Sequence, residues 1–245
     1  SLAAFRDQTR PAYLFDYVCQ RQRVSAADIQ NEHCVLGEKG IARPKVILWG
    51  DSNAAHYVGV IDAIAREAGF SFRNMELGSC PPLLTDPESF VNAKRLPDCL
   101  ASAGFIREAV MAADIIIISA SWSDYLRRSD KFLDVFFATT QSLSDAGKQV
   151  ILMAKAPVAA GYDRRCREKA LSYPFLKCSS GSTSTTAEVT SVNTSLKTYA
   201  DRTPNVAYFD ITPYLCPAGR CSAFNAEGKP LYYDSSHLSL PGSWE

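Results

Sequence analysis

Two short motifs near opposite ends of the chain contain the residue types of nucleophilic catalysis. Ser52 ends the triplet GDS (50–52), and DSSH (234–237) places Asp234 three residues before His237. A serine hydroxyl is a weak nucleophile until a base removes its proton, and histidine is the usual base. An aspartate beside the histidine fixes the imidazole tautomer and stabilises the imidazolium that forms. Together the motifs predict a catalytic triad of Ser52, His237 and Asp234.

Each of these residues also has a purely structural interpretation. Ser52 precedes a helical pattern, where serine is a favoured N-cap. Asp234 is a common turn residue type, and His237 could be an ordinary surface histidine. His56 is the rival base, because it follows Ser52 by four residues and shares its helix face, although we expect a structural role for it. Asp124 is the rival to Asp234 for orienting the base.

The predicted secondary structure brings these motifs to one edge of a sheet. Short apolar, β-branched runs predict buried strands, and residues of three- and four-residue periodicity between them predict helices. The predicted strands are 45–49, 71–77, 114–120, 149–155 and 205–210, and the predicted helices are 52–69, 99–112, 130–146 and 186–201. This alternation predicts an α/β protein with a central parallel sheet of about five strands. Polar segments follow three strands, at the edge where open α/β sheets bind ligands.

Smaller signals refine the ends of these elements. Gly69 is a predicted helix C-cap, and Thr185 with Glu188 fits a capping box at the start of the fourth helix. A short hairpin is predicted after the Cys216/Cys221 pair, and SLPGS (239–243) predicts one more helix.

Composition excludes several classes of partner. The 245 residues contain 26 basic and 26 acidic side chains, so the formal net charge is zero. A nucleic-acid partner is not expected, because such proteins usually carry a basic field. There is no run of eighteen apolar residues and no signal peptide, so we expect any export signal or membrane segment to lie outside this sequence.

The eight cysteines indicate an oxidising compartment. No CxxC pair occurs and only three histidines are present, so neither a zinc site nor another metal or cofactor is expected. Eight cysteines allow 105 pairings, of which nearest neighbours along the chain are the simplest. This predicts disulfides 19–34, 80–99, 166–178 and 216–221. The alternative is a set of buried free thiols in a cytosolic enzyme.

The motifs also carry a family resemblance. GDS (50–52) and DSSH (234–237) resemble the motifs of SGNH (GDSL-type) hydrolases. More narrowly, VILWGDSNAAHY and YYDSSHLS resemble the extracytoplasmic SGNH domain fused to acyltransferase-3 membrane proteins. The resemblance spans about residues 44–245. It implies a three-layer α/β/α, flavodoxin-like fold for an SGNH domain at 45–245, with residues 1–44 as a lead-in extension packed on it.

The resemblance implies an activity and a location. Such domains are serine O-acyltransferases, usually O-acetyltransferases, of bacterial surface polysaccharides such as the O-antigen of lipopolysaccharide. The acceptor is then the polysaccharide, and the acyl donor is delivered across the inner membrane by a transmembrane acyltransferase domain, expected in the same full-length chain. The location is the periplasm. Two alternatives stay open: a secreted carbohydrate O-acetyl esterase and a non-catalytic glycan-binding domain.

The family pattern also implies an oxyanion hole, which this sequence matches only in part. Backbone N–H groups of Ser52 and Gly78 match two of the family's donors, but SASWSDY has no GxND asparagine for the third. Trp122 lies in that region and is a candidate donor through its indole N–H, or a packing residue. Asn53, where the narrower family commonly has histidine, is a predicted substrate contact or loop-orienting residue. Trp122 and Tyr233, with Tyr232, form a predicted sugar-stacking wall, and Asp51 is expected to brace the turn.

Overall fold

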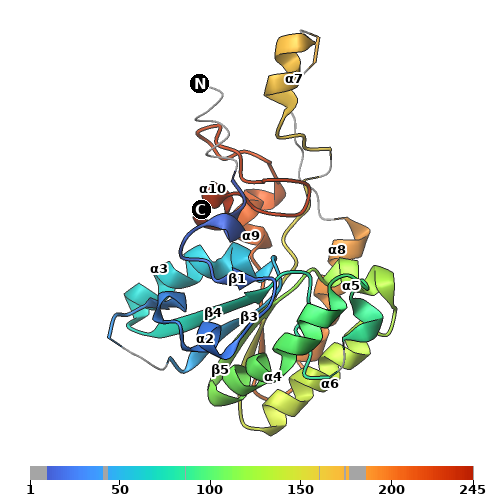
Figure 1. Cartoon of the computed structure of the whole chain (residues 1–245). Coiled ribbons are helices and arrows are strands. Elements are labelled where there is room, and N and C mark those ends of the chain that lie inside the picture. The colour runs from blue at the N-terminus through green and yellow to red at the C-terminus, as the bar shows by residue number, and fades with distance from the viewer. Residues whose placement is uncertain are drawn as a thin grey trace.

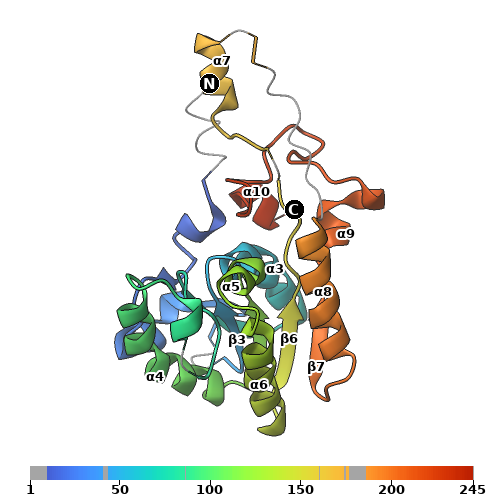
Figure 2. The same ribbon diagram turned by 90° about the vertical axis from the view of Figure 1, so that its right-hand side faces the viewer.

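A seven-stranded, mostly parallel sheet runs through the molecule and has helices on both faces (Figures 1 and 2). The structure, a computed structural model, describes residues 10–40, 44–85, 87–159, 161–173, 175–176 and 186–244. The strand order is β1-β4-β3-β5-β6-β7, with β2 also paired to β4. The strands are β1 (Gln20–Arg21), β2 (Val35–Gly37), β3 (Val46–Gly50), β4 (Ser71–Leu77), β5 (Ile115–Ser119), β6 (Gln149–Met153) and β7 (Val206–Phe209).

The five parallel core strands, β3 to β7, confirm the predicted α/β class and lie within one or two residues of the predicted ranges. Strands β1 and β2 were not predicted, because two or three residues are too short to show a pattern. Both come from residues before 45 and cover the outer edge of β4, with β1 parallel and β2 antiparallel to it. The segment expected as a lead-in therefore supplies the edge of the sheet.

Helices of four to seventeen residues connect and cover the strands. They are α2 (Ala26–Gln30), α3 (Val58–Ala68), α4 (Leu96–Ala112), α5 (Trp122–Arg128), α6 (Phe132–Asp145), α7 (Cys166–Ser172), α8 (Ala187–Ala200), α9 (Thr212–Leu215) and α10 (Leu240–Trp244). Short 3-10 turns are η1 (Ala12–Leu14), η2 (Glu32–Cys34), η3 (Ala54–Tyr57), η4 (Glu88–Phe90) and η5 (Pro217–Gly219).

Alternation along the strands gives the sheet two apolar faces. In β3, Ile47 and Trp49 pack on the face covered by α4, α5, α6 and α8. Val46 and Leu48 point to the opposite face, which α3, α9 and the last part of the chain cover. This is the period of two expected for a strand that is buried on both sides.

The ends of the helices follow from local chemistry. The predicted helix at 52–69 begins as the turn η3 and becomes α-helical only at Val58. Its end is confirmed: Gly69 has φ 72°, the left-handed conformation that glycine adopts without strain. Thr186 caps α8 by accepting the N–H of Val189, whereas the predicted cap Thr185 lies outside the described residues.

The last part of the chain is folded by short bridges between its own residues, and Ser239 also forms a bridge with Pro11. Phe224 pairs with Pro230, and Tyr232 with Leu238, both antiparallel. The helix predicted from SLPGS is present as α10. In contrast, α7 projects away from the sheet in both views (Figures 1 and 2). Among the helices of the described ranges, none is long and apolar enough to cross a membrane.

Three predicted disulfides are confirmed. Cys19 pairs with Cys34, Cys80 with Cys99, and Cys216 with Cys221. Cys166 is also disulfide-bonded, but Cys178, its predicted partner, lies outside the described residues. The first disulfide fastens the ends of the segment between β1 and β2, and Asn74 on β4 binds it by accepting the Cys19 N–H and donating to the Cys34 carbonyl.

Candidate active site

The turn after β3 presents Ser52 at the carboxyl edge of the sheet. A Cβ at Gly50 would lie 1.8 Å from the Ser119 carbonyl oxygen, so only glycine lets β3 and β5 approach this closely. Asp51, only 1% exposed, accepts the N–H of Asn53 at 2.8 Å and of Ser121 at 2.9 Å. As predicted, Asp51 braces the turn, and Ser52 is left partly exposed between two buried residues.

The three predicted triad side chains meet in space. The Ser52 hydroxyl lies 3.0 Å from Nε2 of His237, although 185 positions separate the two in sequence. Nδ1 of His237 lies 2.8 Å from Oδ2 and 3.1 Å from Oδ1 of Asp234. With the Nδ1 proton donated to Asp234, Nε2 presents its lone pair to the Ser52 hydroxyl. This is the arrangement that activates a serine nucleophile.

The backbone of DSSH folds so that Asp234, three residues before His237, can orient the His237 imidazole. Oδ1 of Asp234 accepts the backbone N–H groups of Ser236 and His237, each at 2.8 Å. The N–H of Tyr233 then donates to the His237 carbonyl at 2.8 Å, which closes the loop. Burial alone would raise the pKa of Asp234, but the hydrogen bond and charge of His237 and these N–H groups outweigh it. The pKa lies well below its ordinary value, so the carboxylate is ionised at neutral pH.

His56 lies beside His237, with ring centroids 5.5 Å apart, but its contacts are structural. Its Nε2 accepts the Leu238 N–H at 3.3 Å, so that lone pair is already used. Burial lowers the pKa of His56 well below its ordinary value, and the neighbouring His237 and Lys155 act in the same direction. His56 is therefore a buried neutral imidazole that supports the loop carrying His237.

Asp124 does not reach the site. Its carboxylate bonds to Ser121 Oγ and Arg127 at the surface, while Nδ1 of His237 already bonds to Asp234. Ser52 likewise does not act as a helix cap: Asn53 occupies the N-cap position of η3, and the Ser52 hydroxyl bonds to His237 instead.

A buried lysine that the sequence analysis missed lies under the nucleophile turn. Lys155 lies two residues after the end of β6, is 4% exposed and donates from Nζ to Oδ1 of Asn53. Burial lowers its pKa to about 8, although the charges of Asp51 and Asp234 act to raise it. Asn53 is itself 3% exposed and its amide links the turn to Lys155, which favours the predicted loop-orienting role over the predicted substrate contact. The predicted strand 149–155 included Lys155, but β6 ends at Met153, so Lys155 lies just beyond the carboxyl end of the strand, where open α/β sheets bind ligands.

The oxyanion hole differs from the family pattern at Gly78. The Gly78 N–H donates to the Arg21 carbonyl at 2.9 Å, because β1 extends its pairing with β4, so this N–H is already used. The Gly78 carbonyl accepts two bonds from Arg95, at 2.9 and 3.2 Å. The Gly78 C=O and the Ser79 N–H belong to the same trans peptide and point in opposite directions. Because the carbonyl is bonded to Arg95, the Ser79 N–H points away from Arg95.

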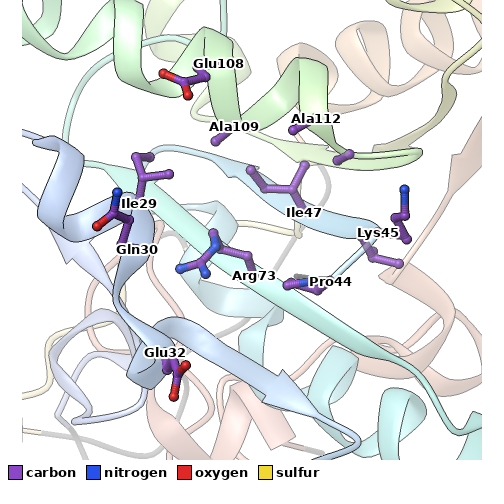
Figure 3. Close-up of a pocket in the computed structure, with 12 residues that line it drawn as sticks. Ile29, Gln30, Glu32, Pro44, Lys45, Ile47, Arg73, Glu108, Ala109 and Ala112 are labelled. Atoms are coloured by element: carbon purple, nitrogen blue, oxygen red, sulfur yellow. The ribbon is translucent and has the colours of Figure 1, made fainter. Parts of the chain in front are cut away.

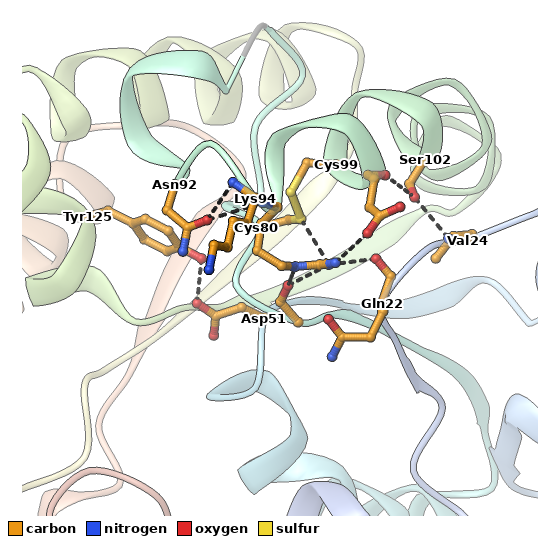
Figure 4. Close-up of a disulfide and its surroundings, with 12 residues drawn as sticks. Gln22, Val24, Asp51, Cys80, Asn92, Lys94, Cys99, Ser102 and Tyr125 are labelled. Carbon is orange, nitrogen blue, oxygen red and sulfur yellow. Dashed lines mark hydrogen bonds and ion pairs between the residues drawn. A yellow bond between two sulfur atoms is a disulfide. The ribbon is translucent and has the colours of Figure 1, made fainter.

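The N–H groups of Ser52 and Ser79 donate no hydrogen bond to any protein group that the structure describes. Ser79 has φ 59°, a left-handed conformation rare for serine and more common at functional sites. Cys80 follows it and is tied to Cys99, close to the Asp51–Tyr125 hydrogen bond (Figure 4). Both N–H groups are therefore candidate oxyanion donors.

Trp122 is a core residue, which corrects two predictions for it. Its side chain is fully buried, and its indole N–H donates to the Met153 carbonyl at 3.2 Å. Phe136 packs against the indole with centroids 4.7 Å apart. Trp122 therefore neither donates to an oxyanion nor stacks on a sugar.

The two tyrosines before DSSH have different environments. Tyr232 is 1% exposed and donates its hydroxyl to the Pro157 carbonyl, so it is part of the core. Tyr233 is partly exposed, and the Arg164 guanidinium lies over its ring at 3.8 Å from the centroid. Of the predicted aromatic wall, only Tyr233 is exposed near His237.

A separate pocket of about 660 Å³ lies at the opposite, amino end of β3 (Figure 3). Lys45, Arg73 and Glu108 are among the residues that line it. It is remote from Ser52, which follows the carboxyl end of the same strand. Within the described ranges, no three His, Cys, Asp or Glu side chains are grouped as metal ligands.

The parallel sheet covered on both faces and the Ser-His-Asp hydrogen-bond array at its carboxyl edge define a three-layer α/β hydrolase-type domain. Residues 18–245 match the family described as the SGNH domain fused to AT3 domains, and the chain belongs to that family. The chain is accordingly an SGNH-type acyltransferase or esterase. No curated protein matches the chain.

Two solved structures share the fold. One is the periplasmic domain of a lipopolysaccharide acetyltransferase from Salmonella ser. Paratyphi A, at 17% identity and TM-score 0.67, covering 93% of this chain and 87% of that one. The other is a Streptococcus pneumoniae protein described provisionally as a platelet activating factor, at 15% identity and TM-score 0.50, covering 84% and 81%. At these identities the likeness is one of fold.

Proposed function

We propose that this chain is a serine-dependent O-acyltransferase that transfers an acyl group, expected to be acetyl, to hydroxyls of a bacterial surface polysaccharide. The observation that carries the proposal is the continuous hydrogen-bond array from Ser52 through His237 to Asp234. Membership of a family fused to AT3 domains supports a transmembrane acyltransferase domain as the source of the acyl group. The likeness to a lipopolysaccharide acetyltransferase domain supports a polysaccharide acceptor and a periplasmic location.

In the acylation step, Nε2 of His237 takes the proton of the Ser52 hydroxyl as Oγ attacks the acyl carbonyl carbon of the donor. The carbonyl oxygen becomes an oxyanion, which the N–H groups of Ser52 and Ser79 stabilise. Collapse of this intermediate breaks the bond to the leaving group, which receives the proton from His237. Ser52 is then an acyl ester.

In the transfer step, His237 removes the proton of an acceptor hydroxyl, whose oxygen attacks the ester carbonyl carbon. The second tetrahedral intermediate expels Ser52 Oγ, which takes the proton back from His237. Asp234 stays ionised throughout and stabilises the imidazolium in both steps. The acceptor leaves as an O-acyl sugar, and the enzyme returns to its starting state.

The first test is covalent labelling with a fluorophosphonate, which reacts with activated serines. We expect labelling of the unmodified protein at Ser52 and none of Ser52→Ala. The matched control is Ser235→Ala, which alters an exposed serine in the DSSH loop and should leave labelling intact. Absent labelling of Ser52 would count against both the acyltransferase and the esterase and would favour the non-catalytic alternative.

The second test separates transferase from esterase. The esterase alternative has some support, because 42% of the Asp234 side chain is exposed and water can approach the loop that carries His237. We expect slow hydrolysis of p-nitrophenyl acetate by the isolated domain and increased release of p-nitrophenol when a glycan acceptor is added, with acetylated glycan detected by mass spectrometry. Fast hydrolysis that does not respond to glycan would instead identify a secreted carbohydrate esterase.

A further inference from the structure

A row of side chains beside His237 is not used by the acyl-transfer steps. Tyr13 meets the His237 ring edge-on, with centroids 5.3 Å apart, and meets Tyr233 in the same way at 6.4 Å. The Arg164 guanidinium lies over the Tyr233 ring, 3.8 Å from the ring centroid. We call Tyr13, Tyr233 and Arg164 the Tyr–Arg row. It extends from the proposed catalytic base to an arginine, and all three side chains are partly exposed.

The Tyr–Arg row is assembled from three distant segments that are each tied to the DSSH loop. The Ala12 N–H, next to Tyr13, donates to the Leu238 carbonyl at 3.1 Å. The Ala159 N–H, at the start of the connection that carries Arg164, donates to the Ser235 carbonyl at 2.9 Å. Tyr233 belongs to the loop itself. Tyr13 and Tyr233 are therefore held beside His237, and Arg164 is placed by its contact with the Tyr233 ring.

Arg164 makes no ion pair with any carboxylate in the part of the chain that the structure describes. Its neighbour Asp163 bonds instead to Lys169, at 2.5 Å. A guanidinium stacked on a ring keeps its planar fork of N–H donors free at the edge, and that fork matches a carboxylate or phosphate. The Arg164 charge also acts on the Tyr13 phenol. Burial raises the pKa of Tyr13 and so do Tyr233 and Asp234, whereas Arg164 lowers it.

We propose that the Tyr–Arg row is an acceptor subsite that binds an anionic sugar residue, with Arg164 pairing with its carboxylate or phosphate and the tyrosines contacting its ring. This inference rests on the proposed function, because it assigns the acceptor of the same site. The acidic group is recognised at Arg164, and the hydroxyl to be acylated then belongs to the part of the glycan that reaches past Tyr13 to Ser52 and His237.

The test measures binding without turnover, on the Ser52→Ala variant of the chain. The probes are trigalacturonate, its methyl ester, and maltotriose with and without a 6-phosphate, each titrated by calorimetry. We expect at least one charged probe to bind about tenfold or more tightly than its neutral counterpart, as for a charge-assisted pair. The two pairs of probes distinguish a carboxylate ligand from a phosphate ligand.

The preference for charge should disappear in Ser52→Ala/Arg164→Gln and persist in Ser52→Ala/Arg165→Gln, which alters the exposed neighbouring arginine. Equal binding of charged and neutral probes, or a preference that survives Arg164→Gln, would overturn the subsite. Because these measurements need no catalysis, that result is distinct from failure of the proposed function, which would appear as absent labelling of Ser52.

Discussion

At the scale of single residues, two histidines lie 5.5 Å apart but have different chemistry. His237 bonds to Ser52 and Asp234, whereas His56 has its Nε2 lone pair occupied by a backbone N–H. We expect His237→Ala to lower kcat by about 10²–10⁴-fold, the usual contribution of a general base. His56→Gln should keep more than about a tenth of the activity while lowering the melting temperature.

Rates of p-nitrophenyl acetate hydrolysis and thermal unfolding curves check this prediction. Circular dichroism of both variants serves as the control for folding. A large loss of kcat in His56→Gln together with retained activity in His237→Ala would reverse the assignment of the base.

Lys155 gives a pH-dependent prediction for the same turn. Its ammonium donates to Asn53, next to the nucleophile, and its pKa is lowered to about 8 by burial. Asp51, Asp234, Glu188 and Arg127 are the other charges that act on it. Below about pH 8 the positive charge favours the oxyanion, and above it the charge is lost.

We therefore expect kcat/KM of the unmodified protein to fall as the pH rises through about 8. Lys155→Met should remove this alkaline limb and lower the plateau by less than the roughly 10²–10³-fold cost of removing a direct oxyanion donor, because Nζ bonds to Asn53. An unchanged alkaline limb in Lys155→Met would assign it to another group. Chemical denaturation of both proteins shows whether the fold is retained.

At the scale of elements, β4 carries a buried acid that makes stability depend on pH. Glu76 is fully buried opposite Gln20 of β1, and neither of its carboxylate oxygens has a hydrogen-bond partner among the described residues. Burial raises its pKa from 4.5 to about 8. The folded state thus binds the proton more tightly than the unfolded state, so the stabilisation is fully present below pH 4.5 and is lost as the pH rises through about 8.

Glu76→Gln replaces the acid by a neutral side chain of the same shape. We expect its melting temperature to exceed that of the unmodified protein by several degrees at pH 8 and to differ little at pH 4.5. Thermal unfolding at a series of pH values measures the difference. Parallel curves for the two proteins would mean that Glu76 does not titrate in this range.

At the scale of the whole molecule, the disulfides hold segments that have little core of their own. The Cys19–Cys34 bond spans 15 positions and fastens β1 and β2 to the sheet edge, whereas Cys216–Cys221 spans only 5. Loop-closure entropy predicts that replacing the first pair by serine costs about 3 kcal/mol of unfolding free energy and replacing the second about 2 kcal/mol.

Urea denaturation of the two double variants compares these costs directly. Because no described cysteine is free, the denatured, unreduced protein is also expected to contain no titratable thiol. Four or more thiols would contradict an oxidising location. A larger cost for the Cys216/Cys221 variant would show that the loop between β1 and β2 is held by other contacts.

Much of this protein follows from local sequence. Gly50, Asp51 and Ser52 form a tight turn after a buried strand, because only glycine fits against Ser119 and the short Asp51 side chain accepts the Asn53 N–H within the turn. DSSH folds an aspartate back onto its own histidine within four residues. The ranges of the five core strands, the three nearest-neighbour disulfides and the two motifs of the triad could be predicted because each depends on a short local pattern in the chain.

Only the tertiary structure decided which polar groups are free. The Gly78 N–H donates to the Arg21 carbonyl in β1, and the Trp122 indole N–H donates within the core. Asn53 accepts a hydrogen bond from Lys155, 102 positions away. Tyr13 reaches His237, and Arg164 reaches Tyr233, from segments that no motif connects. The sequence determines which hydrogen bonds each side chain is able to donate or accept. The actual partner depends on packing between segments that are distant in the chain. A group that is hydrogen-bonded within the fold is no longer available to bind or stabilise a substrate.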